Sequence, residues 1–163
     1  MNLHGTLTAL HAAQVEFVLI GGAAFQLQGG ARPTEDLDFC YSRTTENIRR
    51  LAEALEPFHP RLRNAPEGLP FRFDASTIAH GLNFTLNTDL GAMDFLGEVS
   101  GIGDYAKVKA ASELIVVLGI PRQVLTLEGL LKAKLAAGRE KDLEAIKEIE
   151  SLLEIHRRTG MGK

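Results

Sequence analysis

The sequence lacks most features of secreted, membrane-spanning and nucleic-acid-coating proteins. Its 163 residues include one cysteine and no tryptophan, so no intramolecular disulfide framework can form, and we expect a reducing, cytoplasmic location. The apolar stretch Glu16–Phe25 contains two glycines and is far shorter than the roughly 20 residues of a membrane span. The first 17 residues have no basic start and no long apolar run, which argues against a signal peptide.

Charge and composition narrow the class further. The net charge of −3 argues against a generally basic surface for nucleic acid, although a local basic patch stays open. Hydrophobic residues make up 45% and charged residues 24% of the chain, which is typical of a folded globular protein. We expect a single compact domain: a core over residues 1–125 and a helical segment over 126–163 packed on it.

Hydrophobic periodicity predicts a mixed α/β protein, in the α+β sense, with a small mixed sheet flanked by helices. Alternating or continuous apolar runs predict strands over 15–20, 36–41, 71–73, 82–86, 92–96 and 114–118. Helical spacing predicts helices over 3–13, 23–28, 44–55, 126–137 and 142–157, with Asp142 as the cap of the last. Four prolines between residues 57 and 70 predict a loop. Arg61 and Arg63 in this loop form a modest basic group with Arg72; we interpret the group as solvated, with contact to tRNA or nucleotide phosphate as the alternative.

The strand over 36–41 carries two carboxylates, Asp36 and Asp38. Residues i and i+2 of a strand share a face, so these side chains lie together while Leu37 and Phe39 point into the core. Two like charges this close are costly unless a cation lies between them. Mg²⁺ suits such a pair because it prefers oxygen ligands. The alternative is a pair of solvated aspartates at the sheet edge.

Two further features accompany the acidic pair. Gly21 and Gly22 follow the first predicted strand, and their backbone allows close approach of a phosphate group. Asp94 lies between apolar residues on a later predicted strand and is a candidate third carboxylate. Taken separately, the glycines also fit an ordinary turn, and Asp94 also fits an exposed strand face.

The combination is more specific than its parts. A Gly-Gly turn, 13 intervening residues, an Asp-x-Asp strand and a third Asp on a later strand resemble the polymerase-β-type nucleotidyltransferase superfamily. The run Gly30–Phe39, with its R-x-T-x-D-x-D-F pattern, resembles minimal nucleotidyltransferases related to AbiEii-type toxins of toxin–antitoxin and abortive-infection systems. Leu131–Leu143, which contains K-L followed by R-x-K-D-L, is similar to a second segment of that family. The resemblance spans roughly residues 15 to 150.

The resemblance implies a nucleotidyltransferase fold and transfer of an NMP from an NTP to a hydroxyl of RNA such as tRNA, of a protein or of a small molecule. It assigns one or two Mg²⁺ ions to Asp36, Asp38 and Asp94, and it gives Asp94 a further role in deprotonating the acceptor. It implies an antitoxin as a possible partner. Nucleotide contacts fall to these residues: Gly21, Gly22, Arg32, Thr34, Lys134 and Arg139.

Alternatives remain beside this hypothesis. Ala23 occupies the position after Gly-Gly, where active relatives often have Ser, so the chain also fits an inactive nucleotidyltransferase-fold protein that binds a nucleotide or a protein partner. Arg32 has an alternative as an ion-pair partner of Glu35 or Asp36, and Lys134 as an ordinary surface lysine. A metal-dependent glycosyltransferase rests on the Asp-x-Asp pair alone.

Overall fold

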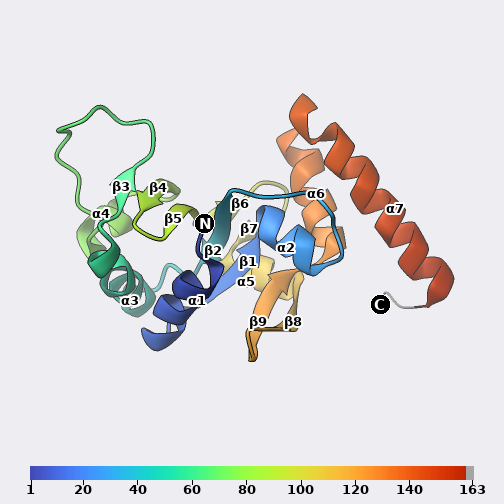
Figure 1. Ribbon diagram of the computed structural model, residues 1–163, viewed down its shortest axis with the longest axis horizontal. Helices are drawn as coiled ribbons and strands as arrows, with labels where there is room; N and C mark the ends of the chain where they lie inside the picture. The colour runs from blue at the N-terminus through green and yellow to red at the C-terminus, as the bar shows by residue number, and fades with distance from the viewer. Residues whose placement is uncertain (161–163) are drawn as a thin grey trace.

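The computed structural model describes residues 1–160 and is built around a seven-stranded mixed sheet (Figure 1). The last three residues of the predicted segment 126–163 lie outside the described residues. The strands, in spatial order, are β3 (Arg61–Leu62), β4 (Phe84–Thr88), β5 (Gly91–Leu96), β2 (Asp36–Tyr41), β1 (Phe17–Ile20), β9 (Ile120–Leu125) and β8 (Ser112–Val117). β2 pairs with β5 and β1 with β9 in parallel, whereas the other neighbours are antiparallel. The predicted mixed α/β class with a mixed sheet is confirmed.

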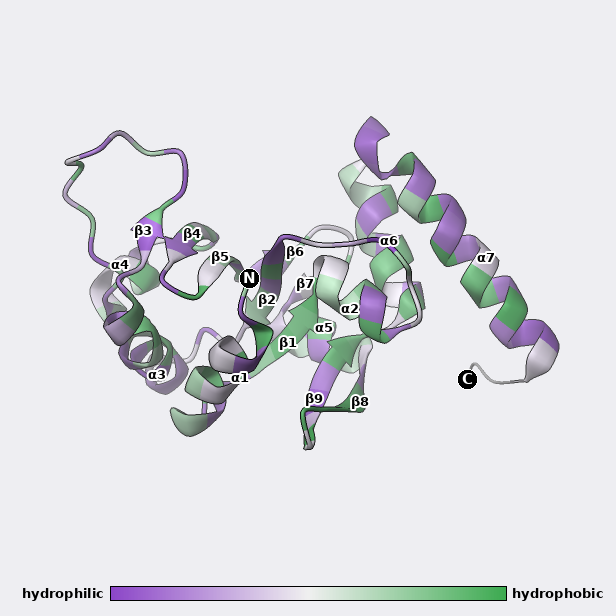
Figure 2. Cartoon of the chain, viewed as in Figure 1, coloured by the Kyte–Doolittle hydropathy of each residue, from purple (hydrophilic) through white to green (hydrophobic). Residues whose placement is uncertain are grey.

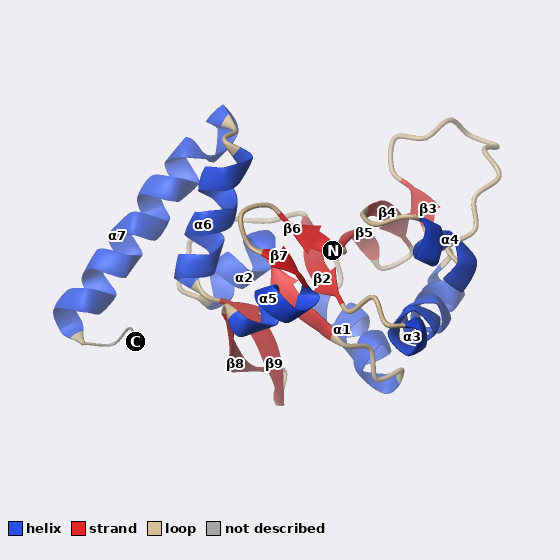
Figure 3. Cartoon of the chain, turned by 180° about the vertical axis from the view of Figure 1, so that it is seen from behind, coloured by secondary structure: helices blue, strands red, loops and turns tan. Residues whose placement is uncertain are grey.

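Helices lie around this sheet, with α3 and α4 at one end of the molecule and α6 and α7 at the other (Figure 3). The helices are α1 (Leu3–Ala12), α2 (Gly21–Leu27), α3 (Thr45–Leu55), α4 (Ala75–His80), α5 (Tyr105–Ala110), α6 (Leu127–Ala137) and α7 (Leu143–Thr159). Short 3₁₀ turns occupy Glu56–Phe58 and Glu140–Asp142, and β6 (Glu98–Val99) pairs with β7 (Gly103–Asp104). Among residues 1–160, no helix is both long and apolar enough to cross a bilayer.

Local sequence accounts for the ends of two helices. The Thr44 side chain accepts a hydrogen bond from the Asn47 backbone N–H (3.2 Å), and Thr126 does the same for Gly129 (3.1 Å). These are ordinary N-caps that satisfy free donors in the first turn. The α6 helix ends at Gly138, whose left-handed backbone (φ +63°) favours glycine. The long helices therefore begin and end within two residues of their predicted positions.

Two expectations about strands and turns are wrong, and strand β9 was not expected. Residues 71–73 form no strand; Phe73 instead packs edge-on against Phe84, with ring centroids 5.3 Å apart. The alternation there reflects an aromatic cluster, not a ladder of hydrogen bonds. Strand β9 was not predicted, because Pro121 and Arg122 interrupt its apolar pattern. Finally, α2 begins at Gly21, so the two glycines form its first turn.

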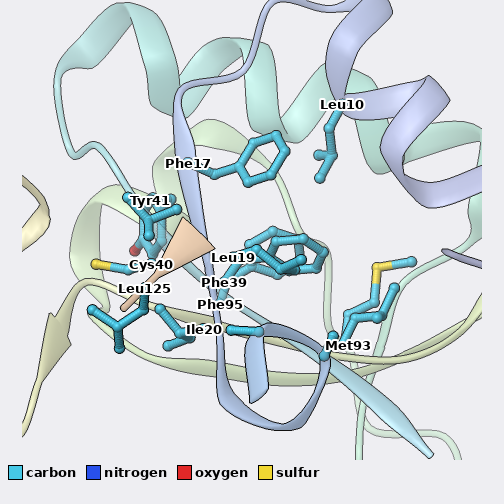
Figure 4. Close-up of a cluster of buried hydrophobic side chains, with 14 of the residues drawn as sticks. Leu10, Phe17, Leu19, Ile20, Phe39, Cys40, Tyr41, Met93, Phe95 and Leu125 are labelled. Carbon is cyan, nitrogen blue, oxygen red and sulfur yellow. The ribbon is translucent and has the colours of Figure 1, made fainter. Parts of the chain in front are cut away.

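The core fixes the position of the acidic strand. Leu37 and Phe39 are buried, as predicted, and Phe39 stacks on Phe95 of β5 with a centroid distance of 5.0 Å. Phe17 of β1 meets Phe39 edge-on at 5.3 Å (Figure 4). Burial of one such side chain contributes about 1.5–3 kcal/mol. These aromatic contacts hold β1, β2 and β5 in register, with their alternate residues on the opposite face of the sheet.

The hydropathy of the residues follows the division between buried and exposed segments (Figure 2). Strand β1 is apolar throughout and fully buried, whereas α7 carries mixed polar and apolar bands because only one of its faces packs on the rest of the protein. Its buried side chains are Ala145, Ile146 and Ile149.

A side-chain hydrogen bond joins the end of α2 to the end of β9: Gln28 Nε2 donates to the Leu125 carbonyl (3.1 Å).

Candidate active site

Three aspartates from two neighbouring strands converge at one point. The register of the parallel pair β2–β5 places Asp38 directly beside Asp94, and Asp36 lies two residues earlier on the same face as Asp38. Carboxylate oxygens of Asp36, Asp38 and Asp94 all lie within 4.8 Å of one another, and the three residues are partly buried. The predicted convergence of these carboxylates is therefore present.

This concentration of charge perturbs proton binding. Burial, followed by the charges of Asp36 and Asp94, raises the pKa of Asp38 from 3.8 to about 7. Burial also raises the pKa of Asp94, although the positive charge of Arg63 offsets part of that effect. Such a cluster is stabilised by a cation, which removes the repulsion and supplies the missing ligation.

Two features require a glycine at position 21: its backbone conformation and its close approach to Asp38. Its φ is +64°, and a Cβ at this position would lie 2.0 Å from Asp38 Oδ2. The absence of a side chain therefore makes room for the carboxylate. A Cβ on Gly22 would lie 2.8 Å from both Cβ and Oγ1 of Thr34, so the second glycine lets the turn pack against the loop that precedes β2.

Thr34 and Arg32 lie in that loop but have different surroundings. The Thr34 hydroxyl donates to the Asp36 carbonyl (3.0 Å) and lies 3.4 Å from Asp36 Oδ1, so it braces the start of the acidic strand. Arg32 points to α7, where its Nη2 lies 2.8 Å from Glu144 and its Nε lies 3.4 Å from Glu148. The alternative partners suggested by the sequence, Glu35 and Asp36, are wrong.

Lys134 and Arg139 share one buried partner. Lys134 Nζ donates to Asp142 Oδ1 (3.1 Å), and Arg139 Nε donates to Asp142 Oδ2 (2.6 Å). Although burial favours the neutral acid, these hydrogen bonds hold the pKa of Asp142 below its usual range. Asp142 does precede α7, but its side chain makes no capping hydrogen bond. The prediction that the Asp142 side chain caps this helix is therefore wrong; the side chain positions Lys134 and Arg139 instead.

A cleft of about 260 Å³ brings the acidic and basic groups to the same space. Gly21, Asp38 and Asp94 line it from the sheet, and Lys134 and Arg139 line it from α6 and the turn that follows. Between them the wall is apolar, formed by Ile20, Leu96, Val99, Leu125, Leu130, Ala133 and Ala137. The cleft therefore combines a carboxylate cluster, a cationic wall and an apolar surface.

The sequence interpretation missed Arg63, which it assigned to a solvated loop. The structure instead places this side chain, only 20% exposed, against the acidic cluster. Its Nη2 lies 2.9 Å from Asp94 Oδ1, and its Nη1 lies 3.8 Å from Asp36 Oδ2. No local pattern signals this contact, because it depends on how β3, β4 and β5 pair across about 30 residues of chain.

The donor set fits a hard divalent cation. Carboxylate oxygens are the ligands that Mg²⁺ and Mn²⁺ prefer, and three of them meet here. Asp94 Oδ1 is buried and accepts no hydrogen bond; its contact with Arg63 Nη2 is an ion pair. A buried carboxylate oxygen in that condition has ligation to spare.

Solved structures similar to this one include proteins described as nucleotidyltransferases. A putative nucleotidyltransferase (TM1012) from Thermotoga maritima superposes with a TM-score of 0.55 at 18% identity, covering 91% of this chain and 94% of that one. ANT(2")-Ia in complex with adenylyl-2"-tobramycin gives 0.57 at 14% identity, covering 96% and 95%. The lincosamide antibiotic adenylyltransferase LnuA, bound to lincomycin, gives 0.57 at 15% identity, covering 90% and 92%. At these identities the likeness establishes the nucleotidyltransferase fold.

The family follows from the sequence match. Residues 7–109 match the family model described as "Nucleotidyl transferase AbiEii toxin, Type IV TA system". Because that match covers more than half of the chain, the protein belongs to the AbiEii nucleotidyl transferase toxin family. No curated protein matches the sequence significantly. The match includes Asp36, Asp38 and Asp94 and ends before Lys134 and Arg139.

Proposed function

We propose that this protein is a Mg²⁺-dependent nucleotidyltransferase that moves an NMP from an NTP to a hydroxyl acceptor. The observation that carries the proposal is the meeting of Asp36, Asp38 and Asp94 beside a cleft that Asp38 and Asp94 line and whose other wall is cationic. A polyphosphate needs both: metal ligands on one side and fixed positive charge on the other.

In this proposal Asp36, Asp38 and Asp94 hold one or two Mg²⁺ ions. When bound, Mg²⁺ neutralises charge on the triphosphate and aligns the attacking and leaving oxygens. Gly21 and Gly22 present their backbone to the phosphates without a side chain in the way. Asp94 has a second role, because its raised pKa suits it to accept the proton of the acceptor hydroxyl.

Lys134 and Arg139 supply the opposite wall. Their shared carboxylate, Asp142, cancels one of the two positive charges, so the trio keeps a net positive charge toward the cleft. Holding the cations in place before the substrate arrives reduces the entropy lost on binding. Arg32 and Thr34 support the same site from the loop before β2, and any nucleotide contact by Arg32 requires that it leave its partners on α7.

Family membership supports a toxin function and an antitoxin partner. The acceptor is proposed as a hydroxyl of RNA (tRNA included), of a protein or of a small molecule. Two structural neighbours are described with the antibiotics tobramycin and lincomycin, which supports testing small molecules as acceptors. Cytoplasmic NTP is the proposed donor.

One observation favours a second function, an inactive nucleotidyltransferase-fold protein that binds a nucleotide or a protein partner. Ala23 follows Gly21-Gly22 and is buried, so this turn offers no hydroxyl to a phosphate. The loss of one phosphate contact lowers affinity without removing the metal site. Binding and transfer therefore need to be measured separately.

The test is calorimetric titration of the four NTPs with Mg²⁺, followed by incubation with α-labelled NTP and RNA, protein and antibiotic pools. The Asp36→Ala/Asp38→Ala variant should lose both binding and label transfer. Glu113→Gln, which changes an exposed carboxylate on β8 outside the cleft, is the matched control and should keep both. Metal-dependent binding without transfer to any acceptor supports the second function. Transfer by the double variant contradicts the first.

A further inference from the structure

We propose that Arg63 is a fixed cationic member of the acidic site and takes the place of a second metal ion, so that the site binds one divalent cation. The inference deepens the proposed function and rests on it, because it assumes that the three aspartates hold a metal. It concerns the number of ions and the residue that sets it.

The position of Arg63 makes it a substitute for a cation. Its guanidinium lies between Asp94 (2.9 Å) and Asp36 (3.8 Å), whereas Asp38 has no ion pair with it. A second metal ion shared by Asp94 and Asp36 would occupy the space that the guanidinium fills. The remaining carboxylate, Asp38, stays open to the cleft beside Gly21.

Contacts with neutral groups hold the guanidinium there. Arg63 Nη2 donates to the Leu86 carbonyl (2.7 Å) and lies 3.4 Å from the Met93 carbonyl. Its Nε donates to Asn87 Oδ1 (3.3 Å), and its own backbone N–H donates to the Thr85 carbonyl (2.9 Å). None of these acceptors belongs to the proposed metal site, so a metal ion bound by the aspartates leaves these hydrogen bonds of Arg63 in place. Displacing Arg63 would therefore break several hydrogen bonds in a largely buried place.

Charge balance agrees with one ion. Three carboxylates and one guanidinium leave two net negative charges when all are ionised, and one divalent ion balances them. A second ion would bring like charge against a guanidinium that cannot lose its proton. Arg63 is thus a positioning residue: it fixes the Asp94 carboxylate and excludes one metal site, and no contact of its own with the substrate is implied.

The test counts ions directly, with Mn²⁺ as the probe. Free Mn²⁺ is measured by electron paramagnetic resonance during titration of the wild type and of Arg63→Gln, with and without a non-hydrolysable ATP analogue. Arg61→Gln is the matched control, since it removes one positive charge two residues away, from an exposed position on β3. We expect one Mn²⁺ per chain for the wild type and Arg61→Gln, and two for Arg63→Gln.

The other outcomes separate a failure of the role of Arg63 from a failure of the proposed function. Two Mn²⁺ ions in the wild type, or one in a folded Arg63→Gln, overturn the role of Arg63 and leave the proposed function intact. No Mn²⁺ in the wild type under either condition removes the metal site, and the proposed function fails with it. If circular dichroism shows that Arg63→Gln is unfolded, a crystal of the wild type grown with Mn²⁺ decides the question. One anomalous peak with Arg63 still beside Asp94 supports the inference, and a displaced Arg63 refutes it.

Discussion

Neutralising Asp38 should stabilise the metal-free protein while it removes the metal site. Asp38 is partly buried between Asp36 and Asp94, and burial together with these two charges raises its pKa to about 7. The unfolded chain offers no such surroundings, so the same carboxyl group ionises there near its ordinary value of 3.8. Asp38→Asn keeps the size of the side chain and removes the charge.

The two pKa values fix the sign and the size of the effect. Between them the folded protein binds more protons than the unfolded chain, so stability falls as the pH rises from about 4 to about 7. A difference of about three pKa units corresponds to about 4 kcal/mol. Because neighbouring groups and water rearrange around the charge, we expect about half of it, ~2 kcal/mol, as the gain for Asp38→Asn at pH 8. Below pH 4 the carboxyl group is protonated in both states, and the gain should vanish.

Thermal unfolding in EDTA at pH 4 and pH 8 measures this effect. For a protein of this length the gain corresponds to a rise in Tm of about 4–8 °C at pH 8. Excess Mn²⁺ should reverse the order, because it stabilises only the wild type. Glu113→Gln should follow the wild type throughout. If Asp38→Asn is less stable than the wild type at pH 8 in EDTA, the ionised carboxylate carries no cost in the folded protein, and the reasoning fails.

Three other substitutions test the supports of the site. Gly21→Ala places a methyl group 2.0 Å from Asp38 Oδ2, and it should weaken Mn²⁺ binding about 10–100-fold in calorimetry; unchanged binding would show that the carboxylate moves freely. Phe39→Ala removes a fully buried ring and should cost about 3–5 kcal/mol in urea unfolding; a loss below 1 kcal/mol would contradict its place in the core. Asp142→Asn removes the buried partner of Lys134. Because its folded pKa is lowered, Asp142 stabilises the protein at neutral pH, and this contribution disappears as the pH falls through that pKa. The variant should lose about 1–3 kcal/mol at pH 7 and bind NTP more weakly, and equal stability at pH 7 would refute the ion-pair role.

Sequence reasoning succeeded where a local pattern carries the structure. The alternation of β2 predicted that Asp36 and Asp38 lie on one face of the sheet and that Leu37 and Phe39 lie on the opposite face. The burial of Leu37 and Phe39 confirms this prediction. It failed where position depends on pairing between distant segments. Arg63 meets Asp94 only because β4 lies between β3 and β5. The composition of residues 57–70 suggested solvent exposure, and nothing local distinguishes Arg63 from its exposed neighbour Arg61.

The two walls of the cleft come from different parts of the chain, and Arg32 connects them. The acidic strand β2 begins just after the loop that carries Arg32, and that side chain pairs with Glu144 and Glu148 on α7. The backbone N–H of Ala31 also donates to Glu148 (3.0 Å). Exposed ion pairs of this kind contribute little stability, about 0–1 kcal/mol each. We therefore infer that they matter for spacing: they hold the loop that supports Asp36 at a set distance from the helices behind the cationic wall.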